Sequence, residues 1–125
     1  MTYEDLLHRL IKEGIAAARA DYQDHPAKLA GSIDGFEACR GKQPLEILEL
    51  LEQARIHTEQ AFVRVNEKEI SDDEYWKTRC HMMEIEWMAN CVSAMLVNQG
   101  LPPIVYPTYR AVLAVARIVG VKEAP

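Results

Sequence analysis

The sequence has few cysteines, no cluster of basic residues and no long hydrophobic segment, and each of these features excludes a class of protein. Three cysteines among 125 residues are too sparse for a disulfide scaffold and fit a reducing compartment. The longest wholly apolar run, Ala111 to Ala116, is far too short to cross a bilayer. The sequence therefore predicts a cytoplasmic protein that has no membrane partner.

The charge pattern argues against a nucleic-acid partner. The 14 lysines and arginines are spread among 19 acidic residues, and the formal net charge is −5. Binding to a phosphate backbone works through clustered basic side chains, which this chain lacks. The first residues, MTYEDLLHRLIKEG, carry charges from Glu4 onward, so we do not expect a secretory signal.

Catalytic motifs are equally scarce. The chain has three serines and contains no G-x-S-x-G, P-loop or G-x-G-x-x-G pattern. In size and helical content it resembles all-α nucleotide pyrophosphatases, which bind magnesium through E-x-x-E on one helix and E-x-x-D on the next. Glu46 and Glu49 match the first half, but Trp87 follows Glu84 at the position where the second half needs an acid. We therefore favour a solvated acidic face, a protein that is not an enzyme and no cofactor.

The hydrophobic residues that are present recur at helical spacing. They predict an all-α, single-domain bundle over residues 1–125, made of three long helices, a short apolar C-terminal helix and a folded linker. The long helices are expected at about 3–22, with Thr2 and Asp5 as the capping pair, at 44 to about 66, and from the Ser71 cap to Gln99. The middle helix is expected to bury Leu45, Leu48, Leu51, Ala54, Thr58, Phe62 and Val65.

Two other segments are less regular. Residues 23–43 contain several turn residues, which predict two short helical pieces, the second capped by Asp34 and ended by Gly41. Residues 109–119 are rich in β-branched side chains, but no second strand candidate exists to pair with them, so we expect a helix. The helix from Ser71 is apolar on nearly every side between Met82 and Val97, which indicates burial all round or a covering subunit.

The stretch RCHMMEIEWMANC, residues 79–91, raises the question of a metal site. Cys80 and Cys91 are eleven residues apart, which places them about 16 Å apart along a helix, so they cannot share a metal and are interpreted as core residues. The alternative is a mixed site in which His8, His81 and Glu84 act together with Asp5. An exposed His81–Glu84 pair is the simpler interpretation, and no metal is predicted.

A polar stripe of Glu86, Asn90 and Ser93 follows on the same helix. It can be a solvated stripe, or a buried line that needs partners because an unpaired carboxylate in a dry core costs several kcal/mol. In the second case Arg40 or Arg110 would pair with Glu86. A small-molecule pocket formed by Glu86, Asn90, Arg40 and Arg110 is then the alternative functional hypothesis, either as a binding protein or as an enzyme.

The leading hypothesis is a protein that acts through an interaction surface near its C-terminus. Tyr106, Tyr109 and Arg110 lie beside three prolines, a composition enriched at binding hot spots. Leu113 and Ile118 extend this surface onto a helix that a monomer would cover poorly, which predicts a homodimer and a possible protein partner.

One resemblance supports an accessory role. The stretches GFEACRGK, residues 35–42, and NCVSAMLVNQGLPPIVYPT, residues 90–108, resemble small uncharacterised proteins of bacteriophages and bacterial mobile elements. The resemblance implies a compact accessory protein and brings no activity or residue roles with it.

Overall fold

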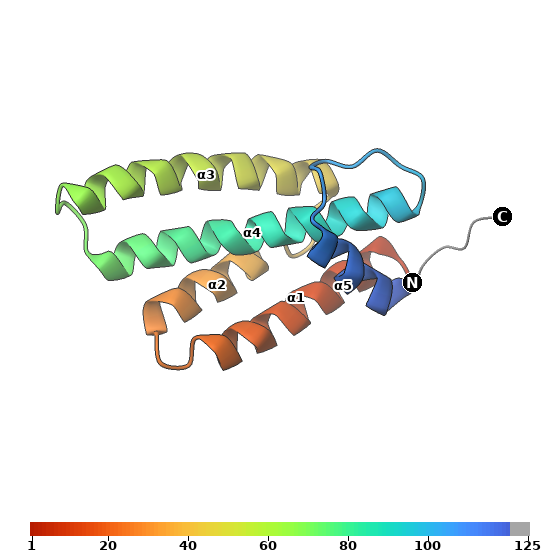
Figure 1. The fold of residues 1–125 in the computed structure, drawn as a ribbon, viewed down its shortest axis with the longest axis horizontal. Helices are drawn as coiled ribbons and strands as arrows, with labels where there is room; N and C mark the ends of the chain where they lie inside the picture. Colours follow the sequence, from red (N-terminus) through yellow and green to blue (C-terminus); the bar gives the residue numbers. More distant parts are fainter. Residues whose placement is uncertain (121–125) are drawn as a thin grey trace.

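Five helices form most of the protein in a computed structural model, which describes residues 1–120 (Figure 1). The all-α prediction is confirmed, and no strand occurs in the described part of the chain. Residues 121–125 of the predicted domain lie outside it. The helices are α1 (Tyr3–Asp21), α2 (Pro26–Ala38), α3 (Pro44–Asn66), α4 (Asp72–Asn98) and α5 (Tyr109–Val119).

Side-chain caps fix where three of the helices begin. The backbone N–H groups of Asp5, Glu74 and Ala111 donate to hydroxyl oxygens three residues earlier, at 3.1, 3.1 and 3.3 Å. Those hydroxyls belong to Thr2, Ser71 and Thr108. Each cap satisfies a backbone donor that the first helical turn leaves without a partner. The predicted starts of α1 and α4 are therefore confirmed.

The central element is α4, which runs through the middle of the bundle with α3 along one side and α1 and α2 along the other (Figure 1). All eight residues from Met88 to Met95 are buried. The apolar second half of α4 is thus surrounded by its own chain, and its burial needs no second subunit. The prediction of one continuous helix from the Ser71 cap is confirmed, whereas the burial expected from Met82 to Val97 is complete only between Met88 and Met95.

The prediction of two helical pieces in residues 23–43 is wrong, because the linker forms a single 13-residue helix, α2. Asp34 lies inside α2, and the N-cap is His25, whose Nδ1 accepts a hydrogen bond from the Lys28 N–H at 3.3 Å. Gly31 and Gly35, four residues apart and therefore on one face, lie against α4. A Cβ at these positions would come within 2.2 Å of the Lys77 carbonyl oxygen and 2.5 Å of the His81 carbonyl oxygen. The glycines permit close packing of two helices.

The buried face of α3 agrees with the prediction at Leu51 and Ala54 and differs from it elsewhere. It consists of Ile47, Leu51, Ala54 and Ala61, whereas Leu45 and Phe62 are exposed. The apolar face is rotated relative to the expected one, and a second set of apolar side chains is left on the outside of the helix. Phe62 contacts the ring of Tyr75, with the two ring centroids 6.2 Å apart.

We predict that Gly31→Ala and Gly35→Ala each lower the free energy of unfolding in urea denaturation. Overpacking a tight contact costs about 1–3 kcal/mol, which exceeds the gain of about 1 kcal/mol from replacing a helical glycine with alanine. Ala30→Ser, on the exposed side of α2, is the control and should stay within about 0.5 kcal/mol of the wild type. Stabilisation by either glycine variant would contradict the close approach of α2 and α4.

Candidate functional site

The polar stripe on α4 is an anchor for the loop between α4 and α5. The Asn90 Oδ1 accepts a hydrogen bond from the Thr108 N–H at 2.8 Å, and its Nδ2 donates to the Glu86 carbonyl oxygen at 2.9 Å. Ser93, which is fully buried, accepts two hydrogen bonds at its hydroxyl oxygen, from the N–H groups of Ile104 and Val105 at 3.1 and 3.0 Å. The buried part of the stripe is therefore satisfied by backbone amides, and no arginine takes part.

These bonds account for most of the backbone donors in residues 101–108. Three of the eight residues are prolines, which have no N–H group. Of the five remaining N–H groups, Leu101 donates to the Leu96 carbonyl oxygen at 2.8 Å and three donate to Asn90 or Ser93. Prolines restrict φ and the buried acceptors fix the amides, so the loop is held rigidly at the start of α5.

Glu86 does not form the predicted buried ion pair with Arg40 or Arg110. Its Oε2 lies 2.9 Å from Nη2 of Arg55 on α3, and both side chains are about half exposed, at 44% and 50%. An exposed pair of this kind contributes at most about 1 kcal/mol to stability. Of the two interpretations of the stripe, the half-exposed Glu86 fits the solvated one, and the alternative of a buried Glu86 is wrong.

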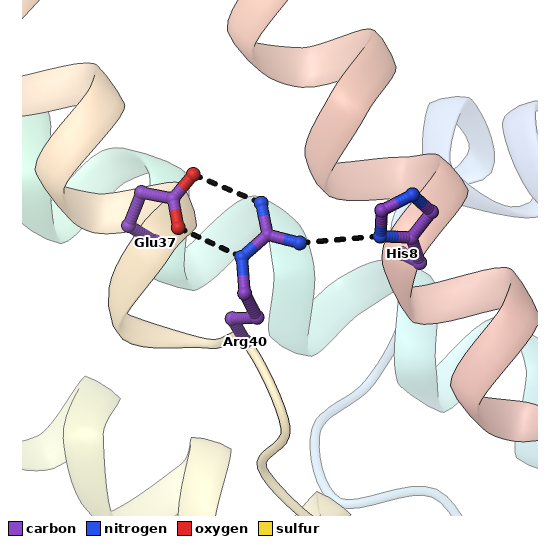
Figure 2. A network of polar contacts seen from close by, with 3 residues as sticks. All are labelled: His8, Glu37 and Arg40. Atoms are coloured by element: carbon purple, nitrogen blue, oxygen red, sulfur yellow. Dashed lines mark hydrogen bonds and ion pairs between the residues drawn. The ribbon is translucent and has the colours of Figure 1, made fainter.

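Arg40 belongs to a different contact, at the end of α2 (Figure 2). Its guanidinium donates to both carboxylate oxygens of Glu37, at 2.8 and 2.9 Å, and its Nη1 lies 3.2 Å from Nδ1 of His8 on α1. Since a guanidinium can only donate, the His8 Nδ1 is the acceptor. The hydrogen bond from Arg40 lowers the pKa of the Glu37 carboxyl. This network connects α1 to the end of α2, and none of its three residues lines the groove that contains Glu86.

The structure does not assemble the alternative metal site. His8 contacts Arg40, and the His81 Nδ1 lies 3.0 Å from a carboxylate oxygen of Asp34. Glu84 instead lies close enough to Asp21 on α1 for the two carboxylates to repel each other. Asp21 is thirteen residues after His8, which places it about 20 Å further along the same helix. Among residues 1–120, no group of three histidine, cysteine, aspartate or glutamate side chains could hold a metal ion.

The acidic residues of α3 have two roles. Glu46 caps its own helix, because its Oε1 accepts a hydrogen bond from the Gln43 N–H at 2.9 Å. Glu49, Glu52 and Glu59 are exposed. A magnesium-dependent pyrophosphatase needs acidic pairs that face each other on two helices. The capping Glu46 and the exposed glutamates of α3 do not form such an arrangement.

A cluster of polar residues that the sequence did not indicate lies between α1, α2 and α4. Burial raises the pKa of the Cys80 thiol, the Glu84 carboxyl and the Tyr22 phenol. Ser32 is fully buried and lies close enough to lower the pKa of both Cys80 and Glu84 in part. The residues are up to 62 positions apart in the chain, so only the fold could reveal this cluster.

The three cysteines are core residues, as predicted. All three are buried and none forms a disulfide. Burial raises the pKa of both Cys39 and Cys91 to about 12, so these thiols stay protonated and unreactive.

A groove of about 580 Å³ opens between α1, α4 and α5. Its lining includes Glu86, Asn90 and Arg110 from the predicted ligand set, whereas Arg40 lies elsewhere. Trp87 and Arg117 also line it. The groove has apolar and charged walls, but two of its predicted polar groups are already engaged, Glu86 by Arg55 and Asn90 by the loop.

The predicted interaction surface is largely exposed. The side chain of Tyr106 is 95% exposed, that of Tyr109 76% and that of Leu113 46%, and Arg110 is exposed as well. Ile118 is the exception, because it packs against the hydrophobic core. The loop itself is attached through Ile104 and Val105, which also pack on the core.

The exposed side chains of α5 form a stripe on its outer face. With 100° between successive residues, the outer stripe consists of the exposed Tyr109, Val112 and Leu113 and the half-buried Ala116. The opposite face, Ala111, Ala114 and Val115, is buried. Helix α5 is therefore apolar on two opposite faces, of which the rest of the chain covers one.

Comparisons with known proteins found no match: no family model fits the sequence, and no curated protein or solved structure is significantly similar to it. In residues 1–120 no helix combines the length and apolar character that a membrane span requires.

We predict that Ser93→Ala releases the loop from α4. The substitution leaves the Ile104 and Val105 N–H groups without their acceptor, and the free energy of unfolding should fall by about 1–3 kcal/mol. Hydrogen exchange at these two amides should become faster. Thr78→Ala is the control, because its hydroxyl bonds only to the Glu74 carbonyl oxygen of the same helix. Unchanged exchange at both amides would show that Ser93 does not hold the loop.

We predict that Glu84→Gln stabilises the protein at neutral pH. Burial raises the pKa of the folded carboxyl above its ordinary value of 4.5, so the unfolded chain ionises first as the pH rises. The wild type should therefore lose stability relative to Glu84→Gln as the pH rises above the ordinary carboxyl pKa of 4.5. Urea denaturation at several pH values measures the difference, with the exposed Glu67→Gln as the control. A wild type that gains stability relative to Glu84→Gln over this range would contradict the burial of a costly carboxylate.

Proposed function

We propose that this chain is a non-enzymatic interaction protein that acts through the outer face of α5 and the loop before it. The contact surface comprises Tyr106, Tyr109, Arg110 and Leu113, and its first partner is a second copy of the chain, so the smallest assembly is a homodimer. One observation carries the proposal: α5 keeps an apolar stripe exposed although its opposite face is already buried.

The way this surface is held supports a binding role. Association costs less conformational entropy when the contact residues are ordered beforehand. Tyr106 lies in the loop 101–108, and Tyr109 follows directly after this loop, whose backbone is fixed by Asn90, by Ser93 and by prolines. Exposed tyrosines beside an arginine on a rigid support are typical of residues that contribute strongly to binding.

The alternative function, a small-molecule site, is supported by the groove between α1, α4 and α5. The observation against a small-molecule site is that Glu86 and Asn90 already form hydrogen bonds within the chain. Arg110 and Arg117 are then the basic groups of the groove that are available to a ligand. Because Arg110 also borders the α5 stripe, we assign it to the interaction surface. The cytoplasmic location and the accessory role in a bacteriophage or mobile element stay predictions from the sequence.

We predict that Leu113→Lys abolishes self-association, because it places a charge in the middle of the apolar stripe. Light scattering over a dilution series should show the wild type heavier than a monomer and the variant as a monomer of unchanged helicity. The control is Val97→Lys, which changes a similarly exposed apolar residue at the end of α4. A wild type that is monomeric at every concentration, or a Leu113→Lys variant that associates like the wild type, would contradict the proposal.

A further inference from the structure

A second exposed apolar stripe lies on α3, on the side of that helix that faces away from α4. With 100° between residues, Leu45, Ile56 and Val63 fall within about 20° of one direction, opposite the buried Ile47, Leu51, Ala54 and Ala61. These three apolar side chains are 68%, 54% and 53% exposed. The same face carries Glu49, Glu52 and Glu59.

The charged residues that accompany the stripes on α3 and α5 have opposite signs, and on α5 they border the stripe along one side. The only charged residues of α5 are Arg110 and Arg117, and neither forms an ion pair within the described residues. On α3, Glu49, Glu52 and Glu59 also form no ion pair within residues 1–120. A basic, apolar helix face and an acidic, apolar helix face are therefore both left without a partner inside one chain.

The spacing of these charges also matches. Arg110 and Arg117 are seven residues apart, as are Glu52 and Glu59, so both pairs span about 10.5 Å along their helices. Apolar residues lie between the charges on both helices, Leu113 on α5 and Ile56 on α3. Two helices laid side by side can thus form two ion pairs that flank an apolar contact.

We propose that α5 of one copy docks on the outer face of α3 of a second copy, with Arg110 and Arg117 paired with Glu52 and Glu59 of that copy. This inference rests on the proposed self-association and names its second surface. Because α3 and α5 pack against α4 from different sides (Figure 1), the contact is heterologous. A homodimer formed in this way keeps one unoccupied α3 face and one unoccupied α5 face, so its mass should grow with concentration.

Charge reversal tests the pairing. We expect Arg110→Glu/Arg117→Glu and Glu52→Arg/Glu59→Arg each to weaken self-association by about tenfold or more, because like charges then face each other across the contact. An equimolar mixture of the two double variants should associate again, since reversed α5 can pair with reversed α3 and the unchanged α5 of one variant can pair with the unchanged α3 of the other. Light scattering and sedimentation measure the masses, and circular dichroism checks that each variant keeps its helicity.

The control is Glu4→Arg/Asp24→Arg, which makes the same change in net charge at exposed positions near the two ends of α1. It should associate like the wild type. The inference is overturned if Glu52→Arg/Glu59→Arg associates like the wild type, or if the mixture stays dissociated. Either result, together with a monomeric Leu113→Lys variant, would leave the proposed self-association intact and place the partner surface elsewhere. A wild type that is monomeric throughout would remove both proposals.

Discussion

The complete burial of residues Met88 to Met95 in α4 is the constraint on which the rest of the structure depends. A helix surrounded by other helices can carry polar side chains only where each finds a hydrogen-bond partner. Asn90 and Ser93 find theirs in the backbone of the segment that returns from the end of α4. The need to satisfy two buried polar groups thereby determines where α5 begins, and so which of its faces is left uncovered.

The contact between α2 and α4 is also unusually close. Gly31 and Gly35 let the two backbones approach more closely than any side chain would permit, and Ser32 is buried between them. Lys28 on the same helix places its ammonium 4.3 Å from the centre of the Trp76 ring, at the exposed margin of the contact. A short helix can in this way pack firmly on the central one.

Helix positions were predictable from sequence where apolar periodicity and caps agree, as they do at Thr2, Pro44 and Ser71. The linker was misinterpreted because glycine is read as a chain breaker, whereas its role here depends on the carbonyl oxygens of a helix over forty residues away. The face of α3 was misplaced because leucines and isoleucines occur around the whole helix, and only packing decides which are buried. The polar stripe was recognised from Glu86 and Asn90, but its partners are backbone amides, which no residue pattern reveals.

The buried cysteines have a practical consequence. Cys39, Cys80 and Cys91 come from α2's end and from α4, and none is accessible in the folded molecule. An alkylating reagent needs both access and a thiolate, and the native state provides neither at Cys39 or Cys91. Modification of these thiols therefore requires that the structure open around them, so its rate reports how often the core is exposed.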